Sequence, residues 1–182
     1  MSTSSKRRCA VGAAALAAVA LLLFPSRALT VRGARDGDLI WAAPVRAGEE
    51  FRLTWIHTVT RRPVTETYAV TAGGRLRLVE MVFDQFGANL PHRPEGGTTW
   101  RIERDRIVVT GYDTVLDRLY LGVAPYGHWL QVGGREWDLL AGAGADRSVR
   151  LAAERLPFIR ILVTEVWQWR NTRPLRGTPK RS

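Results

Sequence analysis

Along most of the chain, apolar and polar residues alternate in short runs separated by turn-forming residues. In the clearest run, Phe51, Leu53 and Trp55 alternate with Arg52 and Thr54. A period of two is typical of strands that have one face in a core and the other in solvent. About nine to eleven such strands at this spacing predict an all-β fold, an antiparallel β-sandwich or a small barrel.

Turn residues separate several of these runs and predict hairpins. The clearest are Ala72–Gly74, Glu103–Asp105 and Gly133–Gly134. The β-branched run Phe158–Val166 is predicted to be the last strand. A helix at Ala145–Glu154 is the main alternative to a strand in that region.

The first 28 residues have the pattern of a secretion signal. Lys6–Arg8 is basic, Cys9–Phe24 is apolar, and small residues stand at Ser26 and Ala28. As a helix the apolar run would span about 24 Å, short of the roughly 30 Å hydrocarbon core of a bilayer. We expect cleavage after Ala28, with an uncleaved anchor as the alternative. Both predict a body outside the cytoplasm, either periplasmic or anchored to the inner membrane.

The chain therefore divides into three predicted parts. Residues 1–28 are a signal peptide or membrane anchor, residues 29–166 an all-β domain, and residues 167–182 a basic tail expected to be disordered. The net charge is +10, but nine of the 27 Lys and Arg residues lie in the two terminal parts, which leaves 18 basic against 17 acidic residues in the body. A nearly neutral body argues against nucleic-acid binding.

Seven tryptophans are many for this length. Five fall in predicted strands and are expected in the core: Trp41, Trp55, Trp100, Trp129 and Trp137. Trp167 and Trp169 instead adjoin the basic tail. Aromatic residues beside cations suit a membrane interface, and packing of a strand end on the core is the alternative.

The residue types restrict the chemistry. The body has no Cys and no Lys, and Ser148 is its only serine, so covalent catalysis has almost no candidate nucleophile. His57, His92 and His128 lack the close spacing of a local metal motif. There is no phosphate-binding glycine loop and no dinucleotide fingerprint. We predict no catalytic residue, no metal ligand and no cofactor.

His57 and Glu66 are the first candidate pair for a functional centre. If Thr60–Pro63 is a four-residue hairpin loop, the two side chains face each other across the ladder, with Cβ atoms about 4.5–5.5 Å apart. Such a pair could form a polar ligand site, a pH-sensitive contact, an acid/base pair or a cross-strand contact that sets the hairpin register. A one-residue change in the loop would separate the two side chains.

Two loops add further candidates. Arg61, at the predicted hairpin tip, is suited to binding an anion or a carboxylate, or is simply solvated. In the loop Phe86–His92, Gly87 is expected to allow positive φ and Pro91 to fix the exit. Such a loop either lines a pocket or is a buried structural element.

The order of these blocks resembles a family of small bacterial envelope proteins of unknown function. The resemblance lies in the blocks His-Thr-Val at 57–59, Pro-Val-x-Glu at 63–66 and Gly-Ala-x-Leu-Pro at 87–91. Thr58 stands where the family commonly has serine, a change that keeps the hydroxyl group. Asn89 stands where the family usually has glycine, and asparagine also tolerates left-handed backbone. Members are often encoded beside TAXI-type TRAP solute transporters. The resemblance implies an accessory role near solute uptake, with TRAP transporter subunits or the solute-binding protein as partners, and no assigned activity.

Three functional hypotheses follow. The first is an exported accessory module of a TRAP-type transporter, which a flat sheet edge or an exposed apolar patch would favour. The second is a small-ligand domain for a carboxylate or a sugar, with His57, Arg61, Glu66 and Asn89 as the candidate ligand-binding residues. A closed apolar pocket with few polar groups would favour it. The third is an acid/base hydrolase, which carboxylates flanking a cleft would favour.

Overall fold

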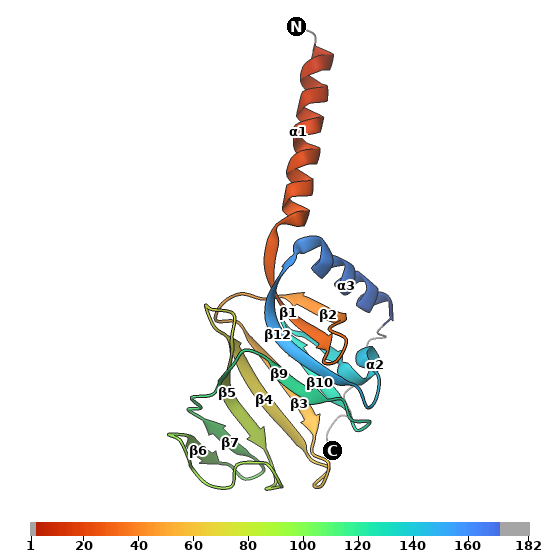
Figure 1. Cartoon of the computed structure of the whole chain (residues 1–182). Helices are drawn as coiled ribbons and strands as arrows, with labels where there is room; N and C mark the ends of the chain where they lie inside the picture. The colour runs from red at the N-terminus through yellow and green to blue at the C-terminus, as the bar shows by residue number, and fades with distance from the viewer. Residues whose placement is uncertain (1–2, 172–182) are drawn as a thin grey trace.

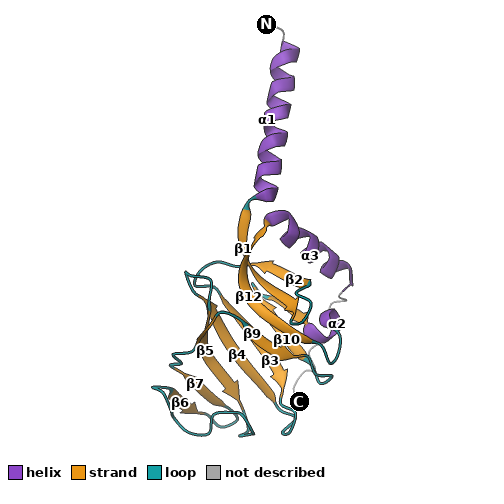
Figure 2. Ribbon diagram, in the orientation of Figure 1, coloured by secondary structure: helices purple, strands orange, loops and turns teal. Residues whose placement is uncertain are grey.

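Two antiparallel sheets face each other in the protein, as Figures 1 and 2 show. The computed structural model describes residues 3–171. The elements in chain order are α1 (Thr3–Leu23), β1 (Pro25–Gly33), β2 (Leu39–Pro44), β3 (Glu50–Ile56), β4 (Pro63–Val70), β5 (Leu76–Phe83), β6 (Thr99–Ile102), β7 (Ile107–Thr110), β8 (Val115–Leu116), β9 (Leu119–Gly122), β10 (His128–Val132), β11 (Arg135–Asp138), α2 (Leu139–Ala143), β12 (Ser148–Pro157) and α3 (Phe158–Asn171).

The smaller sheet has the strand order β2-β1-β12-β9. The larger has the order β11-β10-β3-β4-β5-β7-β6, with β8 paired to β5. Neither sheet closes on itself, so the predicted β-sandwich is confirmed and the small barrel is wrong. The three predicted hairpin turns are also confirmed. They join β4 to β5, β6 to β7 and β10 to β11.

The C-terminal part differs from the sequence prediction. Ser148–Pro157 is a strand, as predicted, but Phe158–Val166 is helical and belongs to α3. The helix forms because Ile161 reaches a small core cluster with Ala28 and Leu156, and this tertiary contact outweighs the β propensity of the run. The predicted tail boundary at residue 167 falls inside α3, and residues 172–182 of the predicted tail lie outside the described residues.

Two further boundaries were not foreseen. Strand β11 ends at Asp138, whose side chain caps α2 by accepting hydrogen bonds from the backbone N–H groups of Leu140 and Ala141. At the other end, β1 begins at Pro25, ahead of the expected boundary, and Ala28 is fully buried. Among the helices described, none is long and apolar enough to cross a bilayer.

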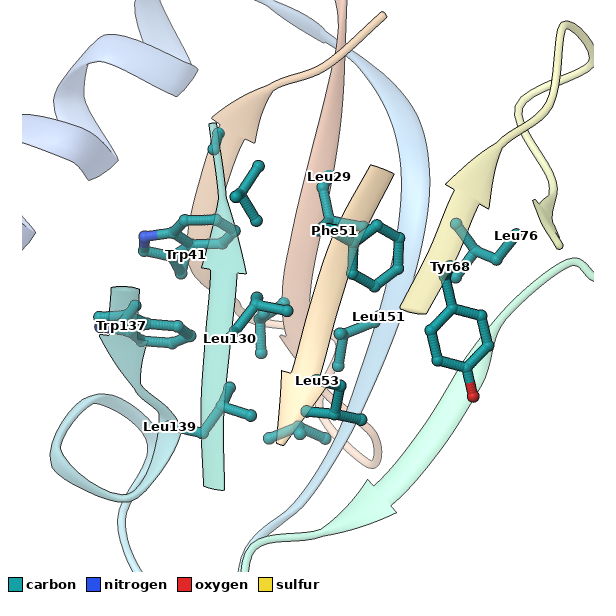
Figure 3. Packing of buried hydrophobic residues seen from close by; sticks show 14 of the residues in the cluster. Leu29, Trp41, Phe51, Leu53, Tyr68, Leu76, Leu130, Trp137, Leu139 and Leu151 are labelled. Carbon is teal, nitrogen blue, oxygen red and sulfur yellow. The ribbon is translucent and has the colours of Figure 1, made fainter. Parts of the chain in front are cut away.

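The main core lies between the sheets, as Figure 3 shows. It includes Leu29 of β1, Phe51 of β3 and the stacked rings of Trp41 and Trp137, whose centroids are 5.1 Å apart. Of the five tryptophans expected in the core, these two are buried and the other three are partly exposed.

A second apolar cluster lies on the larger sheet and includes no residue of the smaller one. It consists of Val64, Met81, Phe83, Leu90, Ile107 and Val109. Leu90 comes from the loop between β5 and β6 and is only 6% exposed. Full burial of a leucine side chain is worth about 1.5–3 kcal/mol, so Leu90 anchors this loop on the sheet. Trp55 and Tyr112 pack against both clusters and mark the boundary between them.

Candidate functional site

His57 joins two loops through its ring. Its Nε2 lies 2.8 Å from the carbonyl oxygen of Ala88, and its Nδ1 lies 3.2 Å from the backbone nitrogens of both Val59 and Thr60. Because Nδ1 accepts from two N–H groups, the neutral tautomer with the proton on Nε2 satisfies all three contacts. The residue is only 4% exposed. Its ring therefore fastens the loop after β5 to the loop between β3 and β4.

The predicted pairing of His57 with Glu66 is wrong. The ladder places Leu53 opposite Glu66, and Trp55 opposite Val64. The connection has six residues, 57–62, rather than four. It closes by a backbone hydrogen bond from Arg61 to the carbonyl of His57, with Arg61 at a φ of 58°. This turn shifts the register away from the one that the four-residue loop predicted.

Glu66 lies on the inner face of the larger sheet, because its ladder neighbours are the buried side chains of Leu53 and Met81. The Tyr68 hydroxyl donates to its Oε2 over 2.9 Å, and the indole of Trp55 also donates to its carboxyl group. Burial raises the pKa of Glu66 above its ordinary value, while these two hydrogen bonds lower it. The polar groups of Glu66, Tyr68 and Trp55 therefore lie together at the boundary between the two apolar clusters, and we call this group of residues the polar seam.

Tyr112 lies at the same boundary, where the charge of Glu66 acts on its hydroxyl group. Burial, and next the charge of Glu66, raise the pKa of its hydroxyl to about 12. The hydroxyl oxygen is inaccessible to solvent and has no hydrogen-bond partner among the described residues. An unpaired buried hydroxyl costs about 1–3 kcal/mol, so its presence calls for an explanation.

A hollow of about 640 Å³ opens beside Tyr112. Polar groups around it come from Asn89, His92, Arg93 and Asp113. Its volume lies within the usual range of small-molecule sites, although it is an open hollow rather than the closed apolar pocket that the ligand-binding hypothesis anticipated.

The loop that borders this hollow takes its shape from two positions. Gly87 does not have the expected positive φ. Instead, a Cβ added there would lie 2.9 Å from Nε2 of His57, so glycine is needed for close approach. Asn89 has the left-handed conformation, with a φ of 65°, as the resemblance suggested that it could.

The four predicted binding residues therefore do not form one site. His57 contacts the loop that carries Asn89, and its ring stacks on Trp55 with centroids 5.8 Å apart. Trp55 in turn contacts Glu66. Arg61 is separate, with its guanidinium 4.1 Å from the ring centroid of Tyr126.

Sequence reasoning did not identify Tyr68 and Tyr112 as site residues. Tyr68 could have been found, since it is two positions from Glu66 and so shares its face of the strand. Tyr112 comes from a distant segment, and no pattern around it in the sequence indicated that it would lie near Glu66. Within residues 3–171, no three His, Cys, Asp or Glu side chains are grouped closely enough to hold a metal ion.

The fold and the seam define a mostly β, antiparallel sandwich domain with polar groups between two apolar clusters. Residues 51–139 of the chain match the model of a family described as a domain of unknown function, DUF1850. The matched segment runs from β3 to the start of α2 and includes His57, Glu66, Asn89 and Tyr112. Comparisons with curated proteins and with solved structures gave no significant match. The association with TRAP transporters stays a prediction.

Proposed function

We propose that this protein is an exported, non-catalytic binding module that holds a small hydroxyl-rich ligand, such as a sugar, in the hollow beside Tyr112, as an accessory to a TRAP-type solute transporter. The unpaired hydroxyl of Tyr112 is the observation that carries the proposal. Because this oxygen is inaccessible without a ligand, binding requires the Tyr112 ring to turn its hydroxyl towards the adjacent hollow, where a ligand hydroxyl would supply the missing partner.

The charges around the hollow favour a sugar over a carboxylate. Arg93 is the only Lys or Arg among the described residues that line the hollow, and its Nε already lies 2.5 Å from Oε1 of Glu95. Asp113 adds a second negative charge. A free carboxylate would meet these two acids, whereas sugar hydroxyls can donate to them and accept from Arg93 and Asn89.

The contacts of His57 support a binding role rather than a hydrolytic one. Both ring nitrogens are already occupied by backbone partners, so the ring has no free position for taking up a substrate proton. The cross-strand pair named for the hydrolase hypothesis is not formed, and of the two carboxylates at the hollow that of Glu95 is already paired with Arg93.

Ligand binding is tested by the variant Tyr112→Phe, with Tyr120→Phe as the matched control, because Tyr120 is exposed on the smaller sheet. The melting temperature of the full chain is measured with millimolar glucose, ribose, N-acetylglucosamine or succinate. A bound ligand raises it by mass action. We expect stabilisation by at least one sugar in the wild type and in Tyr120→Phe, and its loss in Tyr112→Phe.

Tyr112→Phe should also be as stable as the wild type without ligand, or more stable, because an unpaired hydroxyl is removed. Stabilisation by succinate alone would replace the sugar assignment by a carboxylate. If no compound stabilises the wild type, or if Tyr112→Phe responds as the wild type does, the hollow is not the binding site.

Export and the transporter partnership are tested separately. A fusion of the full chain to a reporter that folds only outside the cytoplasm should be active, and N-terminal sequencing distinguishes cleavage after Ala28 from an uncleaved anchor. The exported chain should then co-purify with the subunits or the solute-binding protein of a TAXI-type TRAP transporter expressed beside it. A reporter active only in the cytoplasm would contradict export, and absence of the transporter proteins from the purified complex would contradict the partnership.

A further inference from the structure

Helix α3 has apolar side chains on the face that points away from the body. Its buried contact is Ile161, which is fully buried with Ala28 and Leu156. By contrast, Ile159, Val163 and Val166 are 36%, 58% and 57% exposed. Their spacing of four and three residues puts them on one side of the helix, and we call these three residues the outer stripe.

The outer stripe reverses the usual polarity of a surface helix, which buries its apolar side and presents polar residues to water. Here the inner side already packs on the sandwich, and a second apolar side is left uncovered. Three exposed apolar side chains on one side of a helix form a candidate interaction surface.

The positive charge of residues 167–182, which follow the outer stripe, indicates an anionic partner. From Trp167 to Ser182 the sequence has five basic residues and no acidic one. The exposed Arg160 lies within the helix itself. An apolar helix face together with adjacent basic residues is the combination that binds anionic lipid bilayers, where apolar side chains enter the headgroup boundary and cations attract the lipid phosphates. An acidic protein would also attract the basic segment, but it would not require an apolar stripe beside it.

The position of α3 in the fold agrees with a bilayer partner. The helix starts beside the N-terminal segment, because the backbone N–H of Phe158 donates to the carbonyl of Phe24 over 3.1 Å. Figure 1 shows α1 leaving the body at this same end. Helix α3 therefore starts at the end of the body from which α1 leaves.

We propose that α3 is a membrane-interface helix, which lays the folded body on an anionic bilayer through the outer stripe and the basic segment that follows it. This assignment does not depend on what the hollow beside Tyr112 binds.

The test uses an environment-sensitive fluorophore on a single cysteine of the full chain. Cys9 is the only cysteine and is first replaced by serine. The label is then placed by Val163→Cys and, as the matched control, by Ile102→Cys, because Ile102 is 72% exposed on β6. Each protein is mixed with vesicles of phosphatidylglycerol and phosphatidylcholine, or of phosphatidylcholine alone, and quenching by spin-labelled lipid reports the depth of the label.

We expect a blue shift and quenching at position 163 with the anionic vesicles, and neither change at position 102. In unlabelled protein, Val163→Gln together with Val166→Gln should weaken partition into these vesicles at least about tenfold, since it removes apolar surface from the bilayer contact. Val59→Gln, at a position that is 74% exposed in a distant loop, should not. All three positions are exposed, so thermal melts should stay unchanged.

Several results would overturn the proposal. The first is the absence of a shift at position 163 with either vesicle. The second is an equal shift at positions 163 and 102, which would indicate adsorption without a preferred face. The third is a shift at position 163 on concentrating the protein without lipid, which would assign the stripe to contact between copies of the chain. An equal shift at position 163 with both vesicles would refute the role of the basic segment.

Discussion

The ring of His57 should control how much room the neighbouring loop has for a side chain at position 87. In the folded protein, a Cβ at Gly87 would lie 2.9 Å from Nε2 of His57 and 3.2 Å from Cγ2 of Thr60. Gly87→Ala therefore forces the ring or the loop to move, and overpacking of this kind costs about 1–3 kcal/mol.

His57→Ala has a cost of its own. It removes three hydrogen bonds to backbone groups, which are worth about 0.5–1.5 kcal/mol each. Val59 and Ala88 are exposed residues, so their backbone groups regain water, and the expected loss lies in the lower half of the summed range, at about 1.5–3 kcal/mol. For a chain of this size the melting temperature should fall by about 2–4 °C per kcal/mol.

The two substitutions should be strongly non-additive. Once the ring is gone, the nearest remaining contact of a Cβ at position 87 is Cγ2 of Thr60, at 3.2 Å, so the penalty of Gly87→Ala should fall by at least about 1 kcal/mol in the His57→Ala background. The four proteins are compared by urea unfolding. Gly122→Ala is the control, because nothing lies within 4 Å of a Cβ added there, and its effect should be the same in both backgrounds. An equal Gly87→Ala penalty with and without the imidazole would refute the role given to His57.

Two further predictions concern pH and one concerns the backbone. Because burial raises the pKa of Glu66 from 4.5 in the folded state, its contribution to stability is present at low pH and is lost as pH rises through the folded pKa. Glu66→Gln should abolish that slope in urea unfolding measured at steps from pH 4 to 7, and a persisting slope would contradict the assignment. The dependence of stability on pH that His128 causes has the opposite sign. Burial lowers its pKa below 6.5, so stability should fall as pH drops below about 6.5, and His128→Gln should remove this loss. Asn89 has positive φ, so Asn89→Ala should destabilise by about 1 kcal/mol and Asn89→Gly by less, and equal costs would rule out backbone strain.

The local pattern of the sequence was enough to predict most strands. Alternation in Phe51–Trp55 and the glycine-containing turns at Ala72–Gly74 and Gly133–Gly134 predicted strands and hairpins that are present. This success has a physical reason. A strand that covers a core must alternate along its own length, and a tight turn requires particular residues at its own positions, so both signals lie within a few residues.

The candidate site could not be predicted in the same way. The sequence pointed to His57 and Glu66 as a pair, but their separation depended on the conformation of Arg61 in the connecting turn, which set the ladder register. The charge of Glu66 acts on Tyr112 only because distant segments pack at the boundary of the two apolar clusters. Such contacts depend on packing across the whole domain rather than on neighbours in the chain.

The C-terminal helix α3 is a further case in which a tertiary contact, rather than the local sequence, decides the structure. From its own residues Phe158–Val166 has the composition of a strand, and only the contact of Ile161 with Ala28 and Leu156 accounts for a helix there. The sequence by itself determined the all-β class, the position of most strands and the concentration of basic charge at the two ends. The tertiary structure decided the ladder register, the partners of His57 and Glu66, and the helical conformation of the last apolar run. These features depend on long-range burial that local periodicity does not encode.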